Sequence, residues 1–172
     1  MLKIAITGPE STGKSALCEA LAKHYKTVWV PEFARTYLTE KSPPYTSEIL
    51  DAIAEGQLIS EAQHKLKADK ILFCDTEMTV MKIWSEHAFG TCTQQIQQLY
   101  NKQHYDLYLL MDIDLPWEPD PLREHPDLRE YFFDLYKTEL TKANRYFKII
   151  SGLGDQRTKN AIDIIDKFQA IT

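Results

Sequence analysis

The chain has 172 residues, of which 44% are hydrophobic and 26% are charged, and its formal net charge is −5 at pH 7. This composition predicts one soluble globular domain over residues 1–172, and the acidic balance argues against a nucleic-acid-binding surface. The longest apolar runs are too short to span a bilayer, and the first strand starts too early to leave room for a signal peptide. We therefore expect a cytoplasmic protein that binds small molecules rather than nucleic acid or a membrane.

Residues 2–15, LKIAITGPESTGKS, predict a buried strand, a phosphate-binding loop and the start of a helix. The loop fits the pattern G-x-x-x-x-G-K-[ST], in which backbone N–H groups surround nucleotide phosphates. Lys14 would reach the β- and γ-phosphates, Ser15 would ligate Mg²⁺, and the helix expected at 16–25 would face the phosphates with its N-terminus. An ordinary glycine-rich turn is the alternative, which the flanking strand and helix disfavour. The residues expected to bind ATP are Gly8, Pro9, Glu10, Ser11, Thr12, Gly13, Lys14, Ser15 and Ala16.

Strands and helices alternate along the rest of the chain. Further strands are expected at 27–31, 70–74, 106–111 and 146–150, and further helices at 47–70, 93–105 and 156–171. Ser42, Pro43 and Pro44 are expected to break the chain before the long helix. This alternation predicts an α/β fold, with a five-stranded parallel sheet covered by helices on both faces.

Ligands of such sheets bind outside the carboxyl ends of the strands, where this chain has Glu32, Arg35, Asp75, Glu77, Asp112 and Asp114. Three of these residues suggest specific roles. Asp75 ends the third strand and would hold the Mg²⁺ shell or accept a proton from an attacking hydroxyl; a helix-capping acid is the alternative. Glu32 and Arg35, in the sequence PEFAR after the second strand, should share one face of a helical turn. Glu32 would then accept hydrogen bonds from substrate hydroxyls, and a surface ion pair of small energetic value is the alternative.

Residues 115–130, between the fourth and fifth strands, contain four prolines among charged residues and are called the lid segment below. We expect this segment to be a mobile cover over the phosphates. Arg123 would neutralise charge on the transferring phosphoryl group, whereas Arg129 is equally well explained as part of a solvated loop. Trp117 could stack on a planar base or anchor the segment.

The chain contains ITGPESTGKSAL, PEFAR, DTE after the third strand with Trp84 and Gly90 following, and DLYLLMDIDLPWEPDPLR. On these residues it resembles the kinase domain of the bacterial NadR-type proteins, the ribosylnicotinamide kinases of NAD salvage. The resemblance covers nearly the whole chain. It implies a P-loop NTPase sheet ordered 2-3-1-4-5, ATP and Mg²⁺ at the loop, and phosphorylation of the 5′-hydroxyl of a pyridine nucleoside, nicotinamide riboside. On the matching positions it implies Asp75 as general base or Mg²⁺ partner, Glu32 and Arg35 as substrate contacts and Arg123 as the lid arginine.

Together these arguments assign a role to each candidate residue. The expected catalytic residues are Lys14, Asp75 and Arg123, the metal ligands Ser15 and Asp75, and the substrate contacts Glu32, Arg35, Asp75 and Trp117. NadR-type proteins carry an adenylyltransferase domain ahead of the kinase; this chain begins at the kinase strand, so we expect that activity to be absent. Two other classes remain open: another nucleoside or small-alcohol kinase on the same scaffold, and a nucleotide-dependent switch or ATPase that acts on a protein partner.

Overall fold

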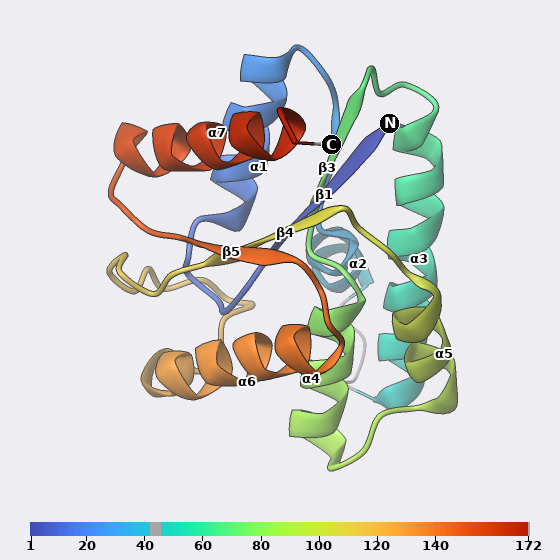
Figure 1. The fold of residues 1–172 in the computed structure, drawn as a ribbon. Coiled ribbons are helices and arrows are strands. Elements are labelled where there is room, and N and C mark those ends of the chain that lie inside the picture. The colour runs from blue at the N-terminus through green and yellow to red at the C-terminus, as the bar shows by residue number, and fades with distance from the viewer. Residues whose placement is uncertain (42–45, 172) are drawn as a thin grey trace.

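The computed structural model describes residues 1–41 and 46–171 and shows a parallel five-stranded sheet between two layers of helices (Figure 1). The strands are β1 (Leu2–Thr7), β2 (Trp29–Val30), β3 (Ile71–Asp75), β4 (Leu107–Met111) and β5 (Phe147–Ile150). The helices are α1 (Lys14–Tyr25), α2 (Phe33–Lys41), α3 (Ser47–Lys65), α4 (Met78–Phe89), α5 (Gln94–Lys102), the 3-10 turn η1 (Pro126–Leu128), α6 (Arg129–Lys142) and α7 (Asp155–Gln169). The strand order β2-β3-β1-β4-β5 confirms the predicted order.

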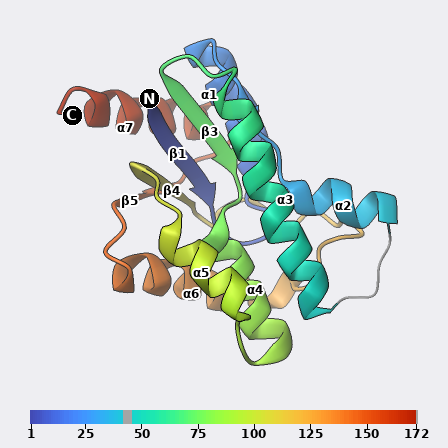
Figure 2. The same cartoon turned by 90° about the vertical axis from the view of Figure 1, so that its right-hand side faces the viewer.

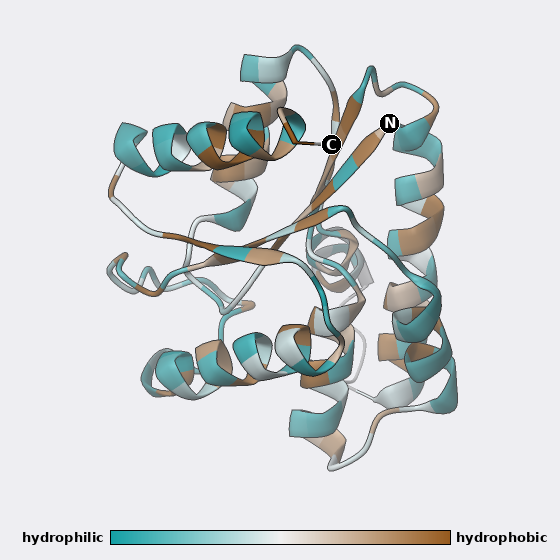
Figure 3. Cartoon of the chain, in the orientation of Figure 1, coloured by the Kyte–Doolittle hydropathy of each residue, from teal (hydrophilic) through white to brown (hydrophobic). Residues whose placement is uncertain are grey.

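Both faces of the sheet are buried. Ala5 of β1 packs into a cluster with α3, α4, α5 and α6, whereas its neighbours Ile4 and Ile6 pack with α1 and α7 on the other face. This alternation arises because successive side chains of a strand point to opposite faces. Figures 1 and 2 show the two helical layers, and Figure 3 shows hydrophobic residues concentrated along the strands. The continuous apolar runs of the sequence thus correspond to strands covered on both sides.

The predicted strands and helices are present, with shifts of a few residues at their ends. The chain break predicted at 42–44 lies outside the described residues. Two helices were not predicted: α4 follows shortly after Asp75, and α6 begins at Arg129, inside the segment expected to be the lid. Among the described residues, no helix combines the length and the apolar character that crossing a membrane would require.

The pairing register brings the carboxyl ends of three central strands to one level. Ile6 of β1 lies opposite Asp75 of β3 and Leu109 of β4. The loop after β1, the acid at the end of β3 and the segment after β4 therefore start from the same edge of the sheet. This is the edge at which parallel α/β sheets bind ligands.

Candidate active site

The loop after β1 has the backbone that phosphate binding requires. Gly8 has φ 133°, and a Cβ there would lie 3.2 Å from the main-chain nitrogen of Met111, so a larger residue would strain the contact. Gly13 has φ 76° and turns the chain into α1. Because a glycine has no side chain to cap the helix, the first N–H groups of α1 stay available to an anion.

Three side chains hold the carbonyl groups of this loop. The Lys14 ammonium donates to the carbonyl oxygens of Gly8 and Pro9 at 2.9 and 2.7 Å. The Thr12 hydroxyl donates to Pro9 at 2.8 Å. From α7, the buried Arg157 donates through Nη1 to the Thr12 carbonyl at 3.2 Å, a contact for which the sequence offered no signal. The protein itself therefore fixes the shape of the loop.

Asp75 lies beneath the start of α1. Its Oδ2 accepts a hydrogen bond from the Ser15 hydroxyl at 2.5 Å, while its buried Oδ1 has no partner among the described residues. Burial, followed by the nearby charge of Glu32, raises the pKa of Asp75 from 3.8 to about 6, against the opposing influence of Lys14 and Ser15. A carboxylate with a pKa in this range is suited to accept a proton near neutral pH.

These oxygens also suit a magnesium ion. Mg²⁺ is usually held by one or two carboxylates together with substrate phosphates, rather than by a cage of protein ligands. The Ser15 hydroxyl and the unpartnered oxygen of Asp75 provide such a partial set of hard ligands. Over residues 1–41 and 46–171, no group of three or more His, Cys, Asp or Glu residues could hold a metal ion by itself. The donor set therefore fits a Mg²⁺ that arrives with a nucleotide.

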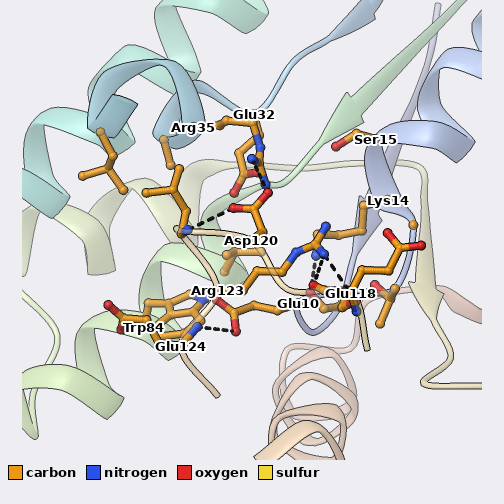
Figure 4. Close-up of a pocket in the computed structure, with 18 of the residues that line it drawn as sticks. Glu10, Lys14, Ser15, Glu32, Arg35, Trp84, Glu118, Asp120, Arg123 and Glu124 are labelled. Atoms are coloured by element: carbon orange, nitrogen blue, oxygen red, sulfur yellow. Dashed lines mark hydrogen bonds and ion pairs between the residues drawn. The ribbon is translucent and has the colours of Figure 1, made fainter. Parts of the chain in front are cut away.

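A cavity of about 880 Å³ extends from the phosphate loop toward α2, α3 and α4 (Figure 4). This volume is within the usual range for small-molecule sites. Apolar side chains line the part away from the loop: Leu38, Leu50, Ile53, Val80, Met81, Trp84 and Tyr136. Five acidic and three basic residues also line it: Glu10, Glu32, Glu118, Asp120, Glu124, Lys14, Arg35 and Arg123. The end of the cavity at the phosphate loop thus suits phosphate groups, and the apolar end suits an aromatic group.

The structure gathers most of the predicted site residues around this cavity. The predicted ATP-binding residues other than Pro9 line it, as do Glu32, Arg35 and Arg123. Asp75 lies behind Ser15, and the half-buried Trp117 is not part of the cavity wall formed by the described residues.

Trp84 of α4 lines the cavity, although from the sequence it had a place in the family resemblance and no role in the site. Its ring stacks on those of His125 and Phe132, with centroids 5.4 and 5.2 Å apart. The helical spacing of Val80, Met81 and Trp84 after the third strand was the pattern that could have revealed it. An aromatic wall is therefore already held in place by packing.

Two residues of the phosphate loop bind the backbone of the lid segment. Glu10 Oε2 accepts hydrogen bonds from the main-chain N–H groups of Glu124 and His125 at 3.2 and 3.3 Å. The Ser11 hydroxyl oxygen accepts from the Glu118 N–H at 2.8 Å. Burial raises the pKa of Glu10, while the two backbone hydrogen bonds act in the opposite direction. The lid segment therefore lies against the phosphate loop in this structure.

The two arginines of this region have different surroundings. Arg123 lines the cavity, and its Nη1 donates to the Glu118 carbonyl at 2.5 Å. Arg129 starts α6 and donates to the carbonyls of Leu115 and Ser11 at 2.8 and 3.2 Å. Arg123 is thus placed to meet a ligand, whereas Arg129 anchors the lid segment to the loop.

Glu32 and Arg35 lie together on the other side of the cavity (Figure 4). Glu32 directly precedes α2, and its Oε2 is 3.9 Å from Arg35 Nε. Arg35 Nη1 pairs with Asp120 Oδ2 at 2.9 Å. The N–H of Leu122, and then Arg35, lower the pKa of Asp120. This ion pair joins α2 to the lid segment across the mouth of the cavity.

Comparison with known proteins places the chain in a family. A family model described as an AAA domain matches residues 3–157. The chain belongs to this AAA domain family. This AAA domain is 29% identical over 126 residues to the trifunctional NAD biosynthesis/regulator protein NadR of Salmonella typhimurium, and equally to that of Escherichia coli. Each match covers 70% of the chain but only 30% of the relative.

Solved structures show the same fold. NadR in complex with NR superimposes with a TM-score of 0.79 at 17% identity, over 99% of this AAA domain and 52% of that chain. NadR in complex with NAD and AMP-PNP superimposes with a TM-score of 0.79 at 19% identity, over 99% of this AAA domain and 50% of that chain. Thymidylate kinase from Ehrlichia chaffeensis superimposes with a TM-score of 0.66 at 16% identity, over 95% of this AAA domain and 98% of that chain. These likenesses confirm the predicted P-loop fold, and the chain spans about half the length of the solved NadR chains.

Proposed function

We propose that this AAA domain is an ATP-dependent kinase that phosphorylates the 5′-hydroxyl of nicotinamide riboside and so forms nicotinamide mononucleotide. The observation that carries the proposal is a single cavity that joins a phosphate loop to an aromatic and acidic pocket. The similarity to NadR, and the fold shared with NadR in complex with NR, support this choice of acceptor.

The nucleotide end of the cavity suits ATP. The N-terminus of α1 faces the loop, and the Lys14 ammonium lies where it can exchange its carbonyl partners for phosphate oxygens. Ser15 would hold Mg²⁺, which supplies positive charge to the phosphates when bound, and Asp75 would be either a second partner of the ion or the base of the transfer step. Together with Arg123, these groups counter the negative charge of a triphosphate.

The acceptor end suits a cationic aromatic ring. The pyridinium ring of nicotinamide riboside carries a positive charge, and aromatic faces attract such cations by about 1 kcal/mol, or more when water is excluded. Trp84 lines the cavity, so we infer that Trp84 rather than Trp117 provides the stacking surface. The excess of acidic over basic residues around the cavity also favours a positively charged acceptor.

The transfer step uses groups from both ends. The 5′-oxygen attacks the γ-phosphorus, the bond from that phosphorus to the leaving ADP breaks, and the hydroxyl proton passes to the Asp75 carboxylate where Asp75 is the base rather than the partner of Mg²⁺. Glu32 accepts hydrogen bonds from the ribose hydroxyls. Arg123 neutralises charge on the transferring group, and the closed lid segment excludes water that would hydrolyse ATP.

The proposal is tested by incubating the protein with Mg-ATP and a panel of nucleosides while ADP release is followed. Nicotinamide riboside is expected to give the fastest release, with nicotinamide mononucleotide identified by mass spectrometry. Faster release with a deoxynucleoside would reassign the protein to another class of nucleoside kinase. Release that is independent of any acceptor would indicate an ATPase.

A further inference from the structure

Gln57 of α3 joins the two halves of the proposed reaction site. Its side chain is 1% exposed, its Oε1 accepts a hydrogen bond from the main-chain N–H of Phe33 at 2.8 Å, and its Nε2 donates to the main-chain carbonyl of Asp75 at 3.3 Å. One buried amide therefore bridges the end of β3 and residues 31–35, which we call the acceptor segment.

The acceptor segment also packs directly on the backbone of α3. A Cβ at Gly56, the residue before Gln57, would overlap the ring of Phe33. Two adjacent residues of α3 thus hold Phe33, one by its ring and the other by its N–H. The flanking side chains of Glu32 and Arg35 both line the cavity, so fixing Phe33 fixes their starting points.

We propose that Gln57 is a positioning residue that sets the separation between Asp75 and the acceptor-binding side chains Glu32 and Arg35. The inference rests on the proposed function for the identity of the acceptor. Misplacing reacting groups by about 1 Å can cost about 10²-fold in rate, so an amide that links both groups has a large effect on phosphoryl transfer. The bridge requires one donor and one acceptor, which glutamine supplies, leucine lacks, and an ionised glutamate supplies only in part.

Gln103 provides a matched control. It is also buried; its Oε1 accepts from the Met78 N–H at 2.9 Å, and its Nε2 donates to Glu61 at 3.1 Å. Removing either glutamine amide leaves buried polar groups without partners and should destabilise the fold to a similar extent. Only Gln57 bonds to the acceptor segment, so the two leucine variants separate positioning from stability.

The experiment compares wild type, Gln57→Leu and Gln103→Leu by steady-state kinetics and by thermal unfolding. Gln57→Leu is expected to raise the KM for nicotinamide riboside and lower kcat, with kcat/KM reduced by about 10- to 100-fold, while the KM for ATP changes less than about twofold. Gln103→Leu should lower the unfolding midpoint without this selective effect. Hydrogen exchange of the Phe33 amide, which requires no substrate, should accelerate in Gln57→Leu alone.

The Gln57→Glu variant supplies a second test that does not depend on the leucine variant folding. A protonated glutamic acid can donate to the Asp75 carbonyl and accept from the Phe33 N–H, whereas the ionised form can only accept. In both forms the Phe33 N–H keeps its acceptor, so the exchange rate of the Phe33 amide in Gln57→Glu should stay close to that of wild type.

Several results would overturn the inference. An unchanged KM for the acceptor and an unchanged Phe33 exchange rate in folded Gln57→Leu would do so. An equal effect of Gln103→Leu, or a Phe33 amide that exchanges much faster in Gln57→Glu than in wild type, would contradict the positioning role. If wild type does not phosphorylate nicotinamide riboside, the proposed function fails on its own, and the exchange rate of the Phe33 amide then decides whether Gln57 holds the acceptor segment.

Discussion

Replacing Asp75 with asparagine is expected to inactivate the protein and stabilise it at the same time. Turnover should fall because an amide cannot take the hydroxyl proton, and the loss of a positioned base costs about 10²- to 10⁴-fold. Stability should rise because the ionised carboxylate of Asp75 is disfavoured by burial and by the charge of Glu32. The asparagine oxygen can still accept the hydrogen bond from Ser15, so the fold loses no contact there.

The size of the stabilisation follows from the pKa. The pKa of Asp75 rises from 3.8 to about 6, and each pH unit corresponds to about 1.4 kcal/mol. Because the pKa of the folded state is the higher one, the stability that the protonated acid contributes is complete below 3.8 and is lost as the pH rises through 6. The raised pKa of Asp75 therefore lowers the free energy of unfolding by about 3 kcal/mol at pH 8 and by roughly half of that at pH 5. Asparagine does not ionise and avoids this cost.

Urea unfolding at pH 8 and pH 5 measures the effect. We expect Asp75→Asn to be more stable than wild type at both values, with the larger difference at pH 8. Asp134→Asn, the same change at an exposed position of α6, is the control and should follow wild type. The reasoning is refuted if Asp75→Asn is less stable than wild type at pH 8, if the difference does not depend on pH, or if the variant keeps most of its turnover.

Three further substitutions test the rest of the site. Lys14→Ala should abolish ATP-dependent turnover while the circular dichroism spectrum and unfolding midpoint stay nearly unchanged, and wild-type turnover would contradict its assigned role. Arg123→Ala should lower kcat more than it changes the KM for the nucleoside. In wild type, amide exchange in the lid segment should slow when an ATP analogue and nucleoside bind. Equal exchange with and without these ligands, together with unimpaired turnover of Arg123→Ala, would indicate a passive loop. Trp84→Ala should raise the KM for nicotinamide riboside by about fivefold, from the loss of about 1 kcal/mol. Trp117→Ala should have little effect, and the reverse result would place the stacking on Trp117.

The phosphate loop and the sheet could be predicted because their determinants are local. The apolar run before Gly8, the two loop glycines and Lys14 lie within the first 15 residues and together form one contiguous motif. The alternation of strands and helices then restricts the sheet to a parallel one, since parallel strands need crossover connections. The carboxyl-end rule selected Asp75, and the structure places it beside Ser15.

Trp84 and Gln57 could not be assigned roles in the same way. The helix that carries Trp84 buries residues on several sides, including Met78, Val80, Met81 and Ile83, so it lacks the one-sided apolar pattern that reveals a surface helix. Gln57 lies in a helix that was predicted, but its hydrogen-bond partners are 24 and 18 residues away in the sequence. Only the folded arrangement of α3, the acceptor segment and β3 brings these groups together.

The support of the phosphate loop by Arg157 has a consequence for biosynthesis. Arg157 reaches the Thr12 carbonyl across 145 residues of sequence, and its Nε is held by the Gly152 carbonyl at 2.8 Å. During translation the loop leaves the ribosome early, whereas α7 emerges only after all five strands have been made. A nascent chain therefore carries the complete loop sequence without the cation that supports its backbone. The nucleotide site is therefore completed only after α7 has been made and has docked.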